Sequence, residues 1–230
     1  MVKLDDTNIE VLDLCLADRP EIPTAEQDVN SVEIRGRHGS LTKKYAYKDI
    51  EYPLTFNFLE DVSFKRAFRK AKVVIFNAKK LFFEDDPDVY YKIKSLTIED
   101  AGNEILEFGQ FTVNFILDPF QYEINNPVQT ITDRTVITNE GYESEPIMTV
   151  HCAGNGKVYV NDIPITIQNI NGTITIDSEM MNAYRKENGL ITNLNNHMIG
   201  DFPVLEHGDN IIDFDGDISK IELIKNWRWV

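Results

Sequence analysis

The chain has 230 residues, 42% of them hydrophobic, which is enough for a substantial core in one large or two small domains and excludes disorder along its whole length. Its formal net charge is −15, and the parts on either side of the Asn125–Asn126 bond carry −7 (16 basic, 23 acidic) and −8 (7 basic, 15 acidic). This balance excludes a basic nucleic-acid-binding module and docking on an anionic membrane. The sequence shows no signal-peptide pattern and no run of ~18 apolar residues, so we expect folding in the cytoplasm.

Alternation of apolar and polar residues marks the strands of the first half. Period two places each apolar set on one face of a strand, and we expect these faces to form the core. The alternating residues are Tyr45 and Tyr47, then Leu54, Phe56 and Phe58, and then Phe111, Val113, Phe115 and Leu117.

A helical pattern interrupts the strands from about Val62 to Lys72, and Asp61 or Ser63 can cap its start. Apolar residues at i, i+3, i+4 and i+7 form a stripe that faces the core. The stripe consists of Phe64, Ala67, Phe68 and Ala71, and the opposite side carries Lys65, Arg66, Arg69, Lys70 and Lys72. This basic side could contact a phosphate, but the acidic chain favours a solvated face or one paired with acids of a neighbouring subunit.

Between Leu81 and Tyr122, two apolar strand patterns each run into an acidic turn that contains proline. The first turn holds Glu84, Asp85, Asp86 and Asp88 around Pro87, and the second is Asp118-Pro119-Phe120. The first set of carboxylates could bind a cation or supply a glycosidase pair. Acidic turns between strands are common, however, and we interpret both segments as turns.

The character of the sequence changes near Asn125-Asn126-Pro127. Shorter strands rich in Ile and Asn follow, separated by glycine-containing turn signals, and Asn171-Gly172 is typical of a type I′ hairpin. The pattern predicts two domains, residues 1–125 with the helix and residues 126–230 as an all-β sandwich. The last strand, Ile218 to Val230, either stays in the sandwich or returns to the first domain.

No motif for chemistry is present. Cys15 and Cys152 are too far apart in sequence for a metal site or a redox pair, and we expect free thiols. The four histidines form no HxH or HExxH pattern, and Asp213-Phe-Asp-Gly-Asp217 lacks the glycine and glutamate of a calcium loop. The sequence therefore predicts no catalytic residue, no metal and no cofactor.

Short motifs in order along nearly the whole chain resemble the siphophage distal tail protein family. They are Arg19-Pro20 with Ile22-Pro23, Gly36-Arg-His-Gly-Ser40, Tyr52-Pro-Leu-Thr-Phe56, Phe64 with Phe68-Arg69, Leu81 with Asp86-Pro87 and Tyr91-Lys92, Gly109-Gln-Phe111 with Phe115 and Asp118-Pro119-Phe120, Glu143-Ser-Glu-Pro146, Ile174-Thr-Ile-Asp177-Ser178, Asn195 with Gly200-Asp-Phe-Pro203, Gly208 with Asn210, and Trp227-Arg-Trp229. Two features depart from the family: the N-terminal segment is short, and the second half lacks the long insertion that carries a carbohydrate-binding module in some relatives.

The resemblance implies a mainly β fold with one short helix, in which an N-terminal ring-forming β domain is followed by a galectin-like β-sandwich. It implies a homo-hexamer that joins the major tail tube protein to the tail-associated lysin or tail-tip protein, and that docks receptor-binding or side-fibre proteins. Such a structural protein is no enzyme; it assembles in the host cytoplasm and is part of the virion tail tip of a phage or prophage.

Subunit contacts are expected where opposite charges gather on different parts of the chain, because a closed ring needs two different patches on each copy. The candidates are Lys65, Arg66, Arg69 and Lys70 on the helix and Asp85, Asp86 and Asp88 in the first acidic turn. The alternative function is a carbohydrate-binding sandwich that contacts saccharides of the host cell wall, with Tyr142, Tyr159, Tyr184 and Trp227 as stacking residues. A β-sandwich hydrolase is disfavoured because no catalytic motif supports it.

Overall fold

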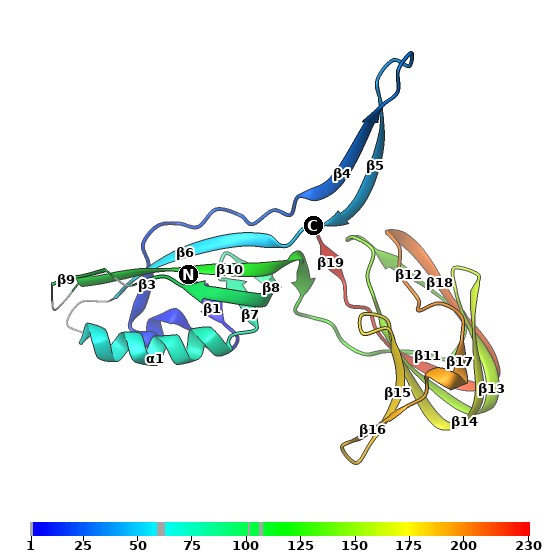
Figure 1. Cartoon of the computed structure of the whole chain (residues 1–230). Helices are drawn as coiled ribbons and strands as arrows, with labels where there is room; N and C mark the ends of the chain where they lie inside the picture. The colour runs from blue at the N-terminus through cyan, green and yellow to red at the C-terminus, as the bar shows by residue number, and fades with distance from the viewer. Residues whose placement is uncertain (1, 59–62, 101, 106–107) are drawn as a thin grey trace. The chain divides into compact units, whose positions relative to one another are not determined.

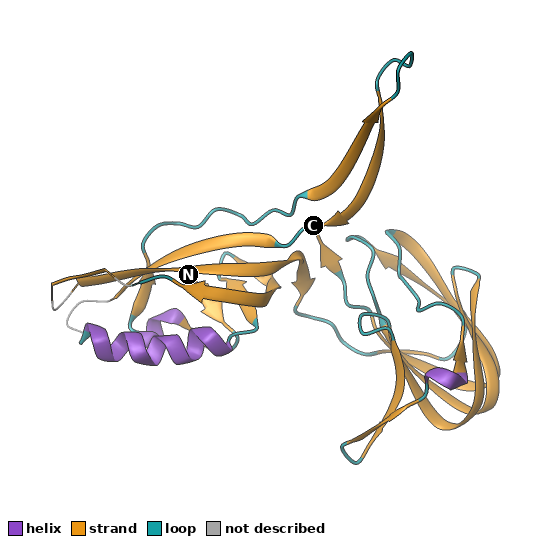
Figure 2. Cartoon of the chain, viewed as in Figure 1, coloured by secondary structure: helices purple, strands orange, loops and turns teal. Residues whose placement is uncertain are grey.

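The computed structural model describes residues 2–58, 63–100, 102–105 and 108–230 (Figure 1). It divides into two compact units, and Asn125 begins the second. Unit 1 comprises residues 1–124 and Val230, and unit 2 comprises residues 125–229. Strands dominate both units, and the described residues contain one α-helix (Figure 2), so the expected mainly β fold with one helix is confirmed.

The main sheet of unit 1 has the strand order β2-β1-β7-β8-β10-β6-β3, and β9 pairs with β10. All of these pairings are antiparallel. The 3₁₀ turn η1 spans Ile9–Leu12. The strands are β1 (Val2–Leu4), β2 (Thr7–Asn8), β3 (Leu14–Leu16), β6 (Ile50–Phe58), β7 (Lys80–Phe83), β8 (Asp86–Ile98), β9 (Gly102–Ile105) and β10 (Phe108–Glu123).

The helix α1 (Phe64–Asn77) lies along one face of this sheet (Figure 1), and its apolar stripe joins the core. Phe111 of β10 is the centre of an aromatic cluster, with ring centroids 5.5 Å from Phe56, 5.6 Å from Phe58 and 4.9 Å from Phe68. The expected core residues of β6 and β10 are buried, because both strands turn their alternating side chains toward α1.

The expected end of the helix was wrong. The helix continues five residues beyond Lys72, because Ile75 extends the apolar stripe and is fully buried in the core. The β-branched run Val73-Val74-Ile75 favours a strand on propensity alone, and tertiary packing overrides that preference. At the other end, Asp61 and Val62 lie outside the described residues, and the Ser63 side chain makes no cap hydrogen bond.

The two acidic segments have different structures. Glu84 and Asp85 form the tight turn between β7 and β8, in which Phe83 pairs with Asp86, so the first expected turn is present. The second is wrong, because Asp118-Pro119-Phe120 lies inside β10, where the register with β8 shifts between Leu117 and Gln121. The Asp118 carboxylate accepts hydrogen bonds from the Phe120 amide and the Tyr122 hydroxyl. These bonds stabilise a bulge within the strand, where the sequence predicted a chain reversal.

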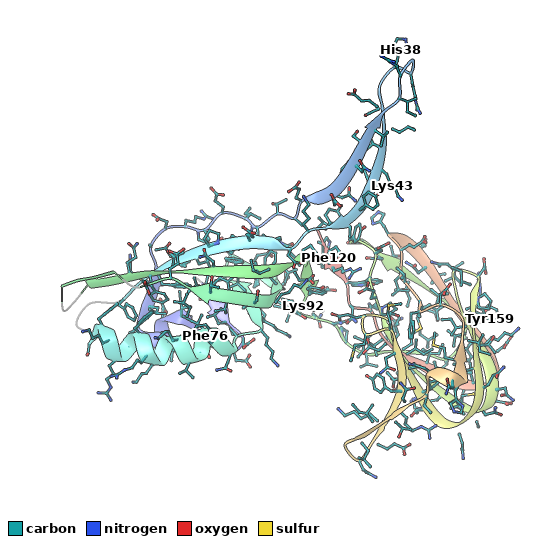
Figure 3. The ribbon with its side chains drawn as sticks, viewed as in Figure 1. His38, Lys43, Phe76, Lys92, Phe120 and Tyr159 are labelled. Carbon is teal, nitrogen blue, oxygen red and sulfur yellow. The ribbon has the colours of Figure 1, made fainter. Side chains whose placement is uncertain are left out.

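A separate two-stranded sheet in unit 1 consists of β4 (Gln27–Glu33) and β5 (Ser40–Tyr47). Figure 1 shows it as a ribbon of its own, and Figure 3 places His38 in the loop at its tip. The expectation that Tyr45 belongs to the core is wrong, because its side chain is 43% exposed on this hairpin. Alternation gives a strand two faces, but here most side chains on both faces are exposed.

Unit 2 forms an eight-stranded curled sheet with the order β11-β18-β13-β14-β15-β16; β12 pairs with β18 and β17 with β14. Isoleucine and valine side chains fill its core. Cys152 is buried there, and both cysteines are free. The strands of this sheet are β11 (Gln129–Ile131), β12 (Thr135–Asn139), β13 (Ile147–Val160), β14 (Ile163–Asp177), β15 (Asn182–Glu187), β16 (Leu190–Asn193), β17 (Met198–Ile199) and β18 (Gly208–Ile224); the 3₁₀ turn η2 spans Asn195–His197. The short strand β19 (Arg228–Trp229) follows β18 and lies outside this sheet.

The hairpin expected at Asn171-Gly172 is absent from unit 2, and the prediction was wrong. Both residues lie inside β14 and pair with Ala153 and Cys152 of β13. The chain reverses instead at Asn161-Asp162, both of which have positive φ. Gly172 has φ of 109°, which bends the long strand without ending it.

Candidate assembly surfaces

The outward side of α1 carries a cationic face that ends in two apolar side chains. Lys65, Arg66, Arg69 and Lys70 are exposed over its first two turns. Val73 and Phe76 follow on the same side and are 64% and 58% exposed. We call these six residues the α1 face. The sequence reasoning found its charges but missed Val73 and Phe76, which the extended stripe ending at Ile75 would have placed on the outside.

The acidic turn, which we define as residues 84–88, is exposed at all five positions. Asn8 donates a hydrogen bond to Glu84 over 3.3 Å, and Arg19 forms an exposed ion pair with Asp85, also at 3.3 Å. Exposed pairs of this kind contribute little because solvent screens them. An open cleft lined by residues 15–20 and 83–85 lies beside the turn. The structure thus presents several carboxylates of this turn to solvent.

Two buried tyrosines anchor the segment that leads from β3 to the β4–β5 hairpin. The Tyr52 hydroxyl donates to the Glu21 carbonyl, and the Tyr91 hydroxyl donates to the Pro23 carbonyl. Burial raises the pKa of both phenols above the ordinary value, and nearby carboxylates add to the effect. Both hydroxyls therefore stay protonated and keep donating at neutral pH, which fixes the base of the hairpin.

The β4–β5 hairpin exposes apolar side chains on both faces. Val32 and Leu41 form a cross-strand pair, and Val29 lies on the other face opposite Lys44. These three side chains are 44–50% exposed. Exposed apolar side chains on a two-stranded ribbon are typical of a surface that associates with another protein. Sequence reasoning missed this surface, because alternation alone does not show whether a covering layer exists.

The helix cations and the acidic turn are not brought together within one chain. No ion pair joins Lys65, Arg66, Arg69 or Lys70 to Asp85, Asp86 or Asp88 in the described part of the chain. Their assignment as subunit contacts therefore stays a prediction, and Asp85 already has Arg19 as a partner within the chain.

The four candidate stacking residues for saccharide do not share one strand register. Tyr159 pairs with Pro164 near the start of β14, and Tyr184 pairs with Thr175 near its end. Tyr159, labelled in Figure 3, donates its hydroxyl to Asp215, and this bond raises the pKa of the phenol. All four side chains, including Tyr142 and Trp227, are half-buried. The four side chains therefore do not form one exposed aromatic surface, and saccharide binding stays a prediction.

The described residues contain no group of three or more His, Cys, Asp or Glu side chains placed to hold a metal ion. A search of the same residues for a helix long and apolar enough to cross a membrane also found none. Unit 1 carries the charged and apolar surfaces described above, and exposed patches of this kind are typical of sites of protein association.

Comparison with known protein families shows which domain contains these surfaces. Residues 5–117 match the model of the phage tail protein RIFT-related domain, which spans α1, the acidic turn and the hairpin. The first half of the chain thus matches a phage tail domain, as the resemblance to siphophage distal tail proteins predicts. No curated protein matches the sequence.

Solved structures extend the likeness to the whole chain. The Dit (gp 19.1) protein of SPP1, described as a paradigm of the hub adsorption apparatus in phages that infect Gram-positive bacteria, aligns with a TM-score of 0.70 and 14% identity over 100% of this chain and 98% of its own. Two structures of the phage P2 baseplate in its activated conformation, one with Ca and one with Sr, align with a TM-score of 0.49 each. Their identities are 12% and 13%, over 92% of this chain and 89% of theirs. At this identity the SPP1 protein shows that the fold is shared.

Proposed function

We propose that the chain is a structural hub of a phage tail tip, which forms a hexameric ring through unit 1. In this role the ring joins the tail tube to the tail-tip or baseplate proteins, and unit 2 offers docking surface to receptor-binding or side-fibre proteins. The assembly belongs to the virion and is built in the host cytoplasm. The phage tail domain over residues 5–117 and the fold shared with SPP1 Dit support this proposal.

The exposed β4–β5 hairpin is the observation that supports the proposed ring most directly. Val32 and Leu41 leave apolar surface exposed on a two-stranded ribbon, and a second copy of the chain would bury that surface in a ring. The hairpin and its tip also carry Arg35, Lys43 and other cations in a chain of net charge −15, which suits an acidic neighbour of the same sequence.

Native mass spectrometry over a protein concentration series tests the ring. We expect a species of six protomers, and Val32→Ser with Leu41→Ser should shift it toward the monomer while circular dichroism stays unchanged. The matched control is Leu190→Ser with Ile191→Ser, on the exposed β15–β16 hairpin of unit 2. A chain that stays monomeric at every concentration, or equal loss of the ring in both double variants, would contradict the proposal.

A further inference from the structure

We propose that the α1 face docks on the acidic turn, residues 84–88, of a second copy of the chain. This inference rests on the proposed ring and names two of the surfaces that meet in it. Each copy would present both surfaces, the cationic one to a neighbour on one side and the acidic one to a neighbour on the other.

Several other lysines of unit 1 have aromatic partners that the cations of the α1 face lack in the described part of the chain. Lys3, Lys80 and Lys92 lie over aromatic rings at 5.2, 4.2 and 3.9 Å from the centroids, and Lys72 of α1 itself lies 4.7 Å from the Phe68 centroid. These contacts stabilise lysines on the surface of the monomer. No comparable contact or ion pair within the described residues involves the four cations of the α1 face.

The position of these cations on the helix is unfavourable in a lone chain. Lys65 and Arg66 occupy the first turn, where the helix dipole is positive, and this turn contains no acidic residue. Like charges at Arg66 and Lys70, four residues apart, repel each other as well. Opposing carboxylates would reverse both effects, because the helix dipole and the cations would then attract the same partner.

A second copy of this chain supplies such a partner. Outside α1 the sequence has 18 basic residues (23 less the 5 of α1) and all 38 acidic ones, so the rest of the chain has a net charge of −20. Among its acids, Asp86 and Asp88 are exposed and lie within the matched phage tail domain, as α1 does. Duplex DNA would also attract the cations, but it would be repelled by the rest of the surface.

The apolar end of the α1 face fits the same turn. Val73 and Phe76 are exposed where the cationic stretch ends, and Pro87 is exposed between the acids of the turn. Packing of Phe76 against Pro87 would exclude water from the charge pairs beside it. Charges that are partly desolvated in this way interact more strongly than pairs on an open surface.

A charge exchange tests the contact. Arg69→Glu with Lys70→Glu, and separately Asp86→Lys with Asp88→Lys, should each weaken self-association on the order of 100-fold, because like charges across an interface cost several kcal/mol. Combining all four substitutions should restore most of the lost affinity, since the opposite charges then meet again. The matched control, Lys157→Glu with Lys186→Glu, changes the net charge by the same −4 in unit 2 and should leave association within about twofold. Sedimentation velocity measures the affinities, and circular dichroism confirms the fold.

The outcomes separate this inference from the proposed function. A wild-type chain that never self-associates overturns both. A wild-type ring that either reversal leaves intact, or that the combined exchange fails to restore, overturns the α1 contact alone. Binding to duplex DNA is measured as a further arm of the test. If the wild type binds DNA and Arg69→Glu with Lys70→Glu abolishes that binding, the α1 face is a nucleic-acid site and the inference is overturned.

Discussion

Replacing Phe111 with alanine would remove the ring at the centre of the aromatic core of unit 1. Its side chain is 2% exposed and contacts the rings of Phe56, Phe58 and Phe68. The rings come from β6, β10 and α1, so a single substitution loosens the packing of the helix on the sheet. The surrounding backbone is held by strand pairing on both sides of β10 and cannot collapse fully into the space.

The expected loss follows from this burial. Truncation of a buried phenylalanine to alanine costs about 3–5 kcal/mol, and lost aromatic pairing places Phe111 near the middle of that range, at about 4 kcal/mol. A unit of this size has a free energy of unfolding of roughly 6–18 kcal/mol. With a denaturant dependence of about 2 kcal/mol per molar urea, the midpoint of unit 1 should fall by about 2 M.

Urea unfolding followed by two signals measures this effect at a concentration below self-association. Trp227 and Trp229 are the only tryptophans, and Trp227 packs against the core of unit 2. In a Trp229→Phe background fluorescence therefore follows unit 2, while far-ultraviolet circular dichroism follows both units. Phe76→Ala is the matched control, because it deletes the same atoms at a 58% exposed position and should change stability by less than about 0.5 kcal/mol. Equal shifts in Phe111→Ala and Phe76→Ala would refute the assignment of Phe111 to the core.

Three further predictions concern single sites. Gly141→Ala should destabilise unit 2 by about 1–3 kcal/mol, because the added Cβ would lie 2.4 Å from the Arg228 carbonyl oxygen; earlier loss of tryptophan fluorescence in urea measures it. A hydrogen bond from Lys220 is the main cause that lowers the pKa of Glu222, so the carboxylate stabilises the fold above the ordinary glutamate pKa, and this contribution is lost as the pH falls through the lowered value. The urea midpoints of the wild type and Glu222→Gln should therefore differ at pH 7 and converge as the pH falls below the lowered pKa of Glu222. Cys15 is half-buried and the other cysteine is buried, so a maleimide should label Cys15 first, and Cys15→Ser should remove the fast phase.

The sequence was sufficient to predict the core of unit 1. The alternating sets of β6 and β10 are buried as expected, because both strands lie at the centre of a sheet that α1 covers. The same alternation at Tyr45 failed, since β5 pairs only with β4 among the described strands and most of its side chains are exposed. Periodicity predicts which side chains share a face, and long-range packing decides whether that face is buried.

Glycine-containing turn signals were the least reliable part of the sequence reasoning in unit 2. Asn171-Gly172 allows positive φ, which both a hairpin turn and a bulge require. The pairing of β14 with β13 continues on both sides of the dipeptide, so the bend serves the curl of a long strand. Local chemistry showed that the chain bends there, but only the register of the partner strand distinguishes a bend from a reversal.

The charges of the candidate surfaces could be found in the sequence because they depend on residue type alone. The exposure of Val73 and Phe76 could not be found in this way. It depends on the length and rotation of α1, which the burial of Ile75 fixes. Their omission matters, since they give the cationic face an apolar end and so distinguish it from an ordinary solvated helix surface.

The distribution of charge also bears on how copies of so acidic a chain can associate. Five of the 16 cations in residues 1–125 lie on α1, so attraction between copies is local whereas repulsion acts between whole chains of charge −15. Salt screens charges beyond a Debye length of about 10 Å at 0.1 M, but it screens close, partly buried pairs much less. Moderate salt should therefore strengthen an interface made by the α1 face, and only higher salt should weaken it. An interface made by apolar packing alone would strengthen with salt throughout, so the salt dependence of self-association distinguishes the two.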